Sequence, residues 1–379
     1  MGVGVSLNLD RLDGISAIAA SQWDALQADG YPFLRHAFLQ ALEDSGAVCA
    51  QTGWQPAHRV VWEGERVQAI MPLYLKQHSY GEYVFDFQWA DAWQRAGRRY
   101  YPKYLSAIPF SPVQGPRLLT HSSAAAELLL ADLEEELLAQ RVSSLHLLFN
   151  AGTEDDWLRE RGWLQRLGCQ FHWFNRDYQC FDDFLAACSS RKRKNFRKER
   201  QAIAEQGISF HWLSGTEITP DDWQRFYPFY AATYLKRGRS PYLGSTFFTR
   251  LGELMPESLR LVFARHQGRE VAGALFLADE HTLYGRYWGC LEEYDRLHFE
   301  TCFYQGMERC IVEGLQRFDA GAQGEHKLLR GFEPVLTQSW HRLQPGLHGA
   351  VADFLLQERE GIQAYQRDAL TYLPFRRAE

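Results

Sequence analysis

The amino-acid sequence predicts an α/β (α+β) protein built from two similar tandem units, each a mixed sheet flanked by helices. The first observation is length: 379 residues exceed what a single hydrophobic core usually serves, so two domains are expected. The second is an order of elements that recurs about 200 positions later in the chain. The third is the alternation of strand-like and helix-like segments within each copy, which is typical of layered units.

The repeat begins with a helix, continues with a strand, a glycine-containing turn and an apolar strand, and ends with an aromatic strand. Apolar residues recur at helical spacing in both copies of the helix, for example Phe38 and Leu42 opposite Phe247 and Leu251. Three consecutive elements in one order and at a nearly constant offset favour duplication over coincidence. The matched segments, first copy before second, are 33–43 and 242–252, 58–62 and 259–263, 64–75 and 268–279, 82–86 and 282–288.

Each copy then continues with a helix and a further strand. In the first copy these are 124–140 and 144–149. In the second copy, apolar residues at spacings of three and four predict one amphipathic helix over 297–315, followed by a strand from 317. We therefore divide the chain into a first unit, 1–175, and a second unit, 176–379, which ends in a helical tail.

Composition limits the class of protein. Apolar residues make up 46% and charged residues 23%, which excludes disordered and collagen-like chains. A net charge of −6 argues against a surface that is basic throughout, although a local basic patch is compatible with it. Seven cysteines without a Cys-x-x-Cys pair predict reduced core thiols.

No apolar run reaches the length of a membrane span, and the N-terminus lacks the pattern of a secretory signal. We therefore expect a soluble, cytoplasmic protein without a transmembrane segment. Gly2 and Ser6 fit the Met-Gly-x-x-x-Ser myristoylation pattern, but so short a pattern recurs by chance and we favour that interpretation.

Seven stretches carry a family resemblance: MPLYLK, GEYVFD, YYPKY, SRKRKNFRKER, LYGRYWG, LHFETCFYQG and GAQGEHKLLRGF. They resemble a family of bacterial N-acyltransferases related to FemAB and FemX, over nearly the whole chain. The resemblance implies a tandem GNAT (acyl-CoA N-acyltransferase-like) fold and an amide-forming acyltransferase. The implied donor is aminoacyl-tRNA or acyl-CoA as co-substrate, with no tightly bound cofactor and no metal. The implied acceptor is an amine, on an amino acid, a peptide or a peptidoglycan-like precursor.

One junction departs from the usual GNAT pattern. Where a glycine-rich turn would hold the pyrophosphate of CoA at a helix N-terminus, residues 289–298 contain three carboxylates and no glycine after Gly289. Because carboxylates repel a pyrophosphate, the sequence slightly favours aminoacyl-tRNA as the donor.

The loop 321–332 holds the densest set of chemically able groups. Glu325 and His326 can transfer protons, and Lys327 and Arg330 can stabilise a phosphate or an oxyanion. The alternative is an ordinary polar turn after a strand. His298 is a further candidate base, with a capping or surface role as its alternative. The predicted catalytic residues are therefore Glu325, His326, Lys327, Arg330 and His298.

The run 191–200 contains seven basic residues. It predicts a helix capped by Ser189 or Ser190, with Phe196 and Ile203 in the core. Clustered cations favour phosphate binding, and a solvated helix face is the alternative. The predicted donor-binding residues are Arg191, Arg193, Lys194, Arg197, Arg286, Tyr287 and Gly324.

The first unit has no copy of GAQGEHK, so we expect the second unit to hold the active site and the first to shape an acceptor groove. Its segments 100–104 and 108–112 are rich in proline and aromatic residues, as suits the wall of a channel. The competing hypothesis is a catalytically inactive GNAT module that binds a peptide, glycan or nucleic acid and has no need of Glu325 or His326.

Overall fold

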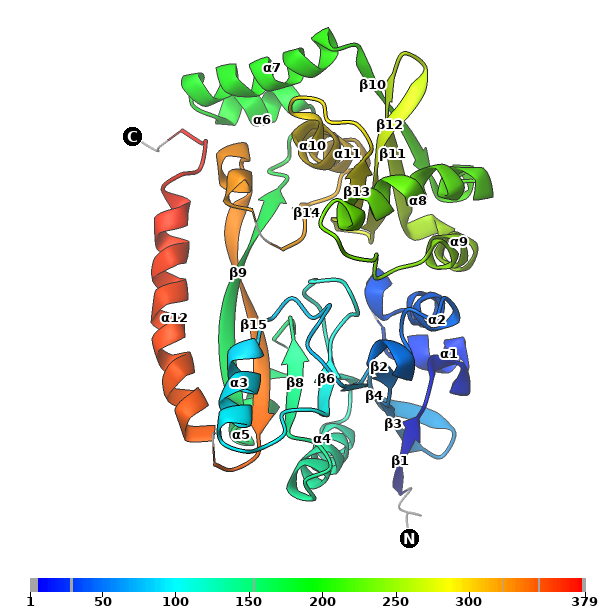
Figure 1. Cartoon of the computed structure of the whole chain (residues 1–379), viewed down its shortest axis with the longest axis vertical. Helices are drawn as coiled ribbons and strands as arrows, with labels where there is room; N and C mark the ends of the chain where they lie inside the picture. Colours follow the sequence, from blue (N-terminus) through cyan, green and yellow to red (C-terminus); the bar gives the residue numbers. More distant parts are fainter. Residues whose placement is uncertain (1–5, 28–29, 153, 323, 347, 377–379) are drawn as a thin grey trace. The chain divides into compact units, whose positions relative to one another are not determined.

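The computed structural model describes residues 6–27, 30–152, 154–322, 324–346 and 348–376 (Figure 1). Gly2 lies outside these residues. The chain forms two compact units, the first from 1–168 and 336–364 and the second from 169–335 and 365–379. The continuous second unit expected from the sequence is thus interrupted. Residues 336–364 belong to the first unit because Leu343, Val351 and Leu355 pack with its Trp89 and Trp93.

The first unit contains two sheets. The smaller is antiparallel in the order β1-β3-β4-β7, and α4 packs on it through Leu129 and Leu133, beside Val61 and Ala69. The other sheet has the order β2-β5-β6-β8 and is extended by residues 336–343 of β15. The strands are β1 (Leu7–Leu12), β2 (Trp54–Pro56), β3 (His58–Glu63), β4 (Arg66–Met71), β5 (Tyr74–Lys76), β6 (Lys103–Ser106), β7 (Leu119–Thr120), β8 (Ser144–Leu148) and β15 (Glu333–Leu343).

The helices of the first unit follow in chain order. They are α1 (Ala20–Trp23), α2 (His36–Asp44), α3 (Phe87–Arg95), α4 (Ser123–Leu138), α5 (Asp155–Glu160) and most of α12 (His348–Leu370), whose last turns belong to the second unit. The helical tail expected at the C-terminus is therefore confirmed as helix. No helix within the described ranges is long and apolar enough to cross a membrane.

The second unit contains one sheet in the order β10-β11-β12-β13-β14-β9. Only the β13–β14 pair is parallel among the pairings within this sheet that the structure describes. The strands are β9 (Leu164–Phe174), β10 (Ile208–Ser214), β11 (Leu259–His266), β12 (Arg269–Ala278), β13 (Thr282–Cys290) and β14 (Arg317–Asp319).

Helices cover both faces of this sheet. Tyr287 of β13 contacts rings of α8 and α9, whereas the next residue, Trp288, contacts His298 of α10. Because consecutive strand residues point to opposite faces, α8 and α9 lie on one side of the sheet and α10 lies on the other. The helices are α6 (Phe181–Ala187), α7 (Ser190–Glu205), α8 (Pro220–Leu235), α9 (Ser245–Leu254), α10 (Leu297–Phe299) and α11 (Gln305–Glu313), with a π-helical turn, η7 (Glu300–Tyr304), and a 3₁₀ helix, η8 (Glu325–Arg330).

The hairpin is the most closely repeated feature of the two units. The two copies are the β3–β4 hairpin and the β11–β12 hairpin. The pair Glu63–Arg66 closes the first and the pair His266–Arg269 closes the second, and both carry a β-bulge at the same step, after Val61 and after Ala264. Each paired residue lies 203 positions after its counterpart, one fewer than the offset that aligns the turn glycines. The same register and the same bulge support the predicted repeat.

Two expected elements differ from the structure. Residues 82–86 form no strand; β7 is instead the next partner of β4 in the sheet. Buried polar contacts of Glu82 and Asp86 hold that segment in an irregular path. The single helix expected over 297–315 is interrupted by the π-helical turn η7 between α10 and α11.

Candidate functional site

The basic run forms the first ten residues of α7 after Ser190. As predicted, Phe196 and Ile203 are buried. Ser189 is the N-cap residue, but its side chain makes no capping hydrogen bond, and no acidic residue lies in the first turn. Cations at a helix N-terminus oppose the helix dipole, so this end of α7 is strongly electropositive.

The cations of α7 lie on two faces. Arg193, Arg197 and Arg200 are spaced four and three residues apart, so they share one face. Lys194 and Lys198 share another and are exposed. Arg197 forms an exposed pair with Asp182, 3.3 Å between Nη2 and Oδ1. The predicted donor-binding residues Arg193 and Arg197 therefore face one way, and Lys194 faces another.

Two adjacent residues anchor α7. The Glu199 carboxylate accepts hydrogen bonds from Tyr304 and from Arg330, the latter at 2.8 Å. Arg200 donates to both Glu300 and Glu308, with Nη2 3.0 Å from Glu300 and Nη1 2.7 Å from Glu308. The basic helix is thus fixed to η8 on one side and to the η7–α11 segment on the other.

The η8 loop lies between two glycines in the left-handed region, Gly324 at φ +108° and Gly331 at φ +87°. Within it, the buried Lys327 Nζ donates to the carbonyl oxygens of Ala320 and Gly321 at 2.9 and 2.8 Å, and to that of Ala322 at 3.4 Å. Burial lowers the pKa of Lys327 to about 8. An ammonium has three N–H donors, and these three backbone carbonyl oxygens accept from all of them. Its predicted role toward a phosphate or an oxyanion is therefore replaced by a structural one.

The other two predicted cations of this region are also held by the protein. Arg286 pairs with Asp319 at 2.6 Å, and both side chains are only 2% exposed. Burial by itself raises the pKa of Asp319, but Arg286, His172 and the Gly321 N–H together hold the pKa below its ordinary value. Arg330 lies 3.4 Å over the ring of Phe299 and donates to the His326 carbonyl oxygen at 2.9 Å.

Tyr287, predicted to bind the donor, instead lies in the core. Its ring packs against Tyr230 of α8 and against Phe247 and Phe248 of α9. Aromatic packing in the core therefore accounts for Tyr287.

Two imidazoles meet beside η8. The His298 and His326 ring centroids are 6.1 Å apart, and Phe303 contacts both rings. Burial lowers the pKa of His298 to about 4, and burial, with Lys327 and Arg330 nearby, lowers the pKa of His326. Both rings are neutral at pH 7. His326 is exposed, as is Glu325, whose carboxylate accepts a hydrogen bond from Tyr365 at 2.9 Å.

The parallel strands β13 and β14 separate next to this cluster. They pair only through 282–284 and 317–319. Beyond that point β13 continues to Cys290, and a bulge at Arg286 shifts its register with β12. β13 therefore extends beyond its pairing with β14 on the side where Trp288 contacts His298.

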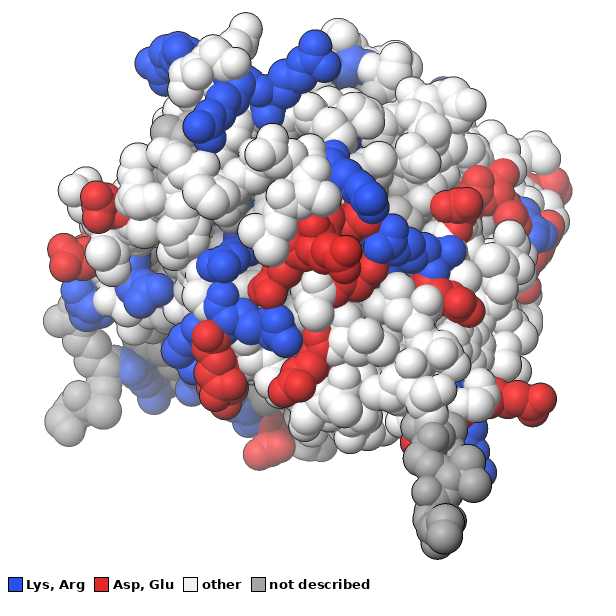
Figure 2. Space-filling view, turned by 90° about the horizontal axis from the view of Figure 1, so that it is seen from below, with Lys and Arg blue, Asp and Glu red and all other residues white. Residues whose placement is uncertain are grey.

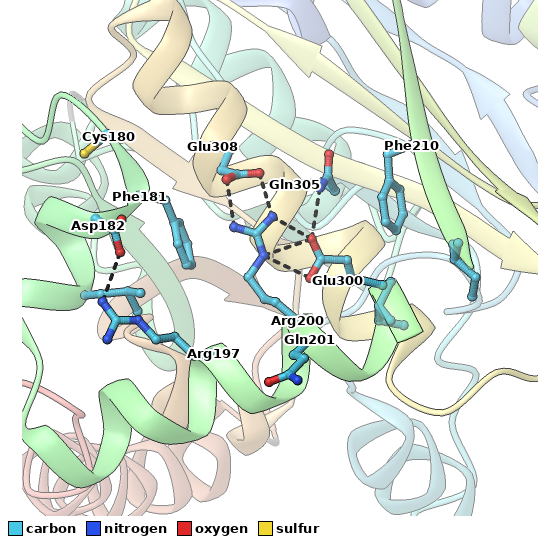
Figure 3. Close-up of a pocket in the computed structure, with 14 residues that line it drawn as sticks. Cys180, Phe181, Asp182, Arg197, Arg200, Gln201, Phe210, Glu300, Gln305 and Glu308 are labelled. Carbon is cyan, nitrogen blue, oxygen red and sulfur yellow. Dashed lines mark hydrogen bonds and ion pairs between the residues drawn. The ribbon is translucent and has the colours of Figure 1, made fainter. Parts of the chain in front are cut away.

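A cavity of about 620 Å³ lies between α6, α7, β10 and the η7–α11 segment (Figure 3). Glu300, Gln305 and Glu308 line one side, and Arg197, Arg200 and Gln201 another. The π-helical turn explains this arrangement. Residues five apart lie far round an α-helix from each other, but i→i+5 bonding brings Glu300 and Gln305 together, with Gln305 Nε2 2.9 Å from Glu300 Oε1.

A buried polar network in the first unit escaped the sequence analysis as a cluster. Lys103 Nζ donates to Glu82 and Ser79 at 2.8 Å each, and also to Asp86. Lys76 lies 3.6 Å over the Trp54 ring. The stretches MPLYLK, GEYVFD and YYPKY each supply members, but nothing in their order showed that they would meet.

Charges elsewhere are mixed. The face in Figure 2 shows acidic side chains gathered together, with basic side chains beside them. At the β13–α10 junction, Glu292 and Glu293 are exposed. Gly289 serves packing, since a Cβ there would lie 1.7 Å from the Phe229 carbonyl oxygen of α8. Among the residues that the structure describes, no His, Cys, Asp or Glu cluster could hold a metal ion.

Comparison with solved structures identifies the fold. FemX matches with a TM-score of 0.52 at 11% identity, covering 94% of this chain and 100% of that one. The C-terminal domain (DUF2156) of a putative lysylphosphatidylglycerol synthetase from Agrobacterium fabrum gives 0.51 at 12%, covering 90% and 94%. L-PGS from Bacillus licheniformis gives 0.50 at 10%, covering 92% and 98%. The expected tandem GNAT fold is confirmed.

Comparison with curated proteins finds no match. A family model does match, across residues 14–377, and its description reads peptidoglycan biosynthesis/recognition. The match spans both units and all seven stretches that carried the resemblance. The chain therefore belongs to the FemAB-like family.

Proposed function

We propose that the protein is an N-acyltransferase that moves an acyl or aminoacyl group from an activated donor to an amine. FemAB-like membership and the GNAT fold support acyl transfer in general. The donor is aminoacyl-tRNA or acyl-CoA, both of which carry phosphate. The acceptor is an amine of an amino acid, a peptide or a peptidoglycan-like precursor.

One connection carries the proposal. The electropositive helix α7 is joined through Glu199 to Arg330, and Arg330 holds the carbonyl oxygen of His326. A phosphate bound by α7 would therefore be held by the same rigid assembly that positions the imidazole. Such positioning can lower the activation barrier for transfer by a large amount.

His326 is the group we assign to proton transfer. The acceptor nitrogen attacks the donor carbonyl carbon and a C–N bond forms. The C–O bond of an aminoacyl ester, or the C–S bond of a thioester, then breaks. The proton removed from the amine passes to His326 and leaves on the departing oxygen or sulfur.

The test measures transfer from labelled acyl-CoAs and charged tRNAs to amine acceptors. His326→Gln should lower turnover by about 10² to 10⁴ while leaving stability unchanged, because the ring is exposed. Since the imidazole must be unprotonated, wild-type turnover should fall as the pH drops through the lowered pKa of His326. In His326→Gln, part of the lost rate should return at high pH, where the acceptor amine deprotonates unaided.

Glu325→Gln tests the neighbouring carboxylate independently of the imidazole. His121→Gln removes an exposed imidazole of the first unit and serves as the control. We expect Glu325→Gln to slow turnover as well, with donor binding unchanged. Normal turnover in both loop variants would contradict the assignment of chemistry to η8.

The second candidate is a catalytically inactive module that binds a peptide, glycan or nucleic acid. One observation favours it: Lys327, Arg330 and Arg286 all bond to protein atoms. It predicts donor binding without transfer for every donor and acceptor tried.

A further inference from the structure

The 620 Å³ cavity lies on a different face of the α10–α11 segment from the imidazole cluster. His298 and Glu300 are two residues apart, which is about 200° round a helix. Phe299 and Phe303 contact His326, whereas Glu300, Gln305 and Glu308 line the cavity. The cavity is therefore separate from the candidate site of proton transfer.

The cavity is polarised along α7. At its floor, Glu300 and Glu308 hold Arg200, so two carboxylates meet one guanidinium. At its rim lies Arg197, in an exposed pair with Asp182. Arg193, outside the lining, continues the same helix face toward the electropositive N-terminus. A ligand complementary to this arrangement carries negative charge at one end and hydrogen-bond donors at the other.

The lining suits a flat heteroaromatic group at the end of the ligand that carries no phosphate. Phe181 and Phe210 provide rings, and Leu185 and Ile208 provide apolar surface. Each oxygen of Glu308 accepts one hydrogen bond from Arg200, so both can accept another from an amino group. A cavity of this size is within the range of small-ligand sites.

We propose that this cavity binds the nucleoside of a nucleotide-bearing ligand whose phosphate is held at Arg193 and Arg197, with an amino-bearing base such as adenine toward Glu308. From residue 193 to residue 200 an α-helix rises about 10 Å, which is comparable to the length of a nucleotide. The inference rests on the proposed function only for the phosphate site on α7. CoA and the 3′ end of tRNA both present adenosine linked to phosphate.

The test is direct binding of ADP, adenosine and inorganic phosphate to the full chain, measured by calorimetry without any turnover. Ala204→Leu narrows the cavity from an exposed lining position, and Ala202→Leu, on the same helix and outside the lining, is its control. We expect Ala204→Leu to weaken ADP and adenosine at least tenfold and to leave phosphate unchanged. Arg193→Gln with Arg197→Gln should weaken ADP and phosphate but not adenosine.

Two results would overturn the inference: ADP binding unchanged by Ala204→Leu, or phosphate binding as tightly as ADP. Repeating the measurement with CoA and with a short RNA ending in CCA tells which source supplies the nucleoside. Sensitivity of either to Ala204→Leu supports the site, and insensitivity of both overturns it. A chain that binds ADP in the cavity but transfers no acyl group would overturn the enzyme proposal alone.

Discussion

The charged stretches of the two units have opposite fates. In the first unit, Lys76, Glu82, Asp86 and Lys103 are buried and bond to one another or to nearby polar groups. In the second unit, Lys194 and Lys198 of the basic run are exposed to solvent. The two units share a hairpin register and a bulge, so they differ in the charged segments outside that hairpin.

This contrast shows that a motif rich in charge does not by itself indicate a ligand site. A buried ammonium between carboxylates is neutralised within the protein, and its loss endangers the fold. An exposed run of cations contributes little to stability and retains its charge for a partner. Burial decides between these roles, and the variants of Lys103, Glu82 and α7 described below test the distinction.

The largest effect is expected for Lys103→Met in the first unit. It leaves Glu82 and Asp86 as buried carboxylates without their shared cation, which should cost about 3 to 5 kcal/mol of unfolding free energy. Chemical denaturation measures this loss. Arg99→Met, which removes an exposed cation of the same unit, should change it by less than about 0.5 kcal/mol. Equal losses in the two variants would argue against a structural role for the network.

Gly289→Ala should break the second unit instead. The added Cβ would lie 1.7 Å from the Phe229 carbonyl oxygen, so α8 must move from the sheet, at about 3 kcal/mol. Gly244→Ala meets no atom within 4 Å and should cost less than about 1 kcal/mol. A stable Gly289→Ala protein would show that α8 does not pack as described.

The first unit should also respond to pH through Glu82. Burial raises the pKa of Glu82 to about 7, with Lys103, Asp86 and Lys76 as its charged neighbours. Because the folded state holds this proton more tightly, the Glu82 contribution to stability is largest below the unfolded pKa of 4.5. It declines as the pH rises through 7, by up to about 3 kcal/mol. Glu82→Gln should flatten this slope in pH-dependent denaturation, whereas Glu135→Gln, at an exposed position, should not.

The smallest effect sharpens the exposed side of the comparison. Arg193→Gln with Arg197→Gln removes two charges from the cavity face of α7, and Lys194→Gln with Lys198→Gln removes two from another face. The first pair should weaken donor binding about tenfold and reduce its salt dependence. The second pair should weaken it less, with both melting temperatures unchanged. Equal weakening would mean that α7 acts only through its net charge.

Much of the fold followed from the sequence because local patterns determined it. Helical spacing at 245–254, the two glycine turns and the basic helix with Phe196 and Ile203 inward all appear as expected. The strand expected at 82–86 failed because burial of Glu82 and Asp86 around Lys103 outweighed its aromatic strand pattern.

The sequence by itself determined the repeat, the fold family and the stretches that are rich in charged and titratable groups. Tertiary structure decided which of their side chains are free to act. Lys327 and Arg286 look like ligand cations in the sequence, yet carbonyl oxygens and Asp319 occupy them. The contact of His326 with His298 and the cavity beside Arg200 became visible only in three dimensions, because both depend on contacts between residues far apart in the chain.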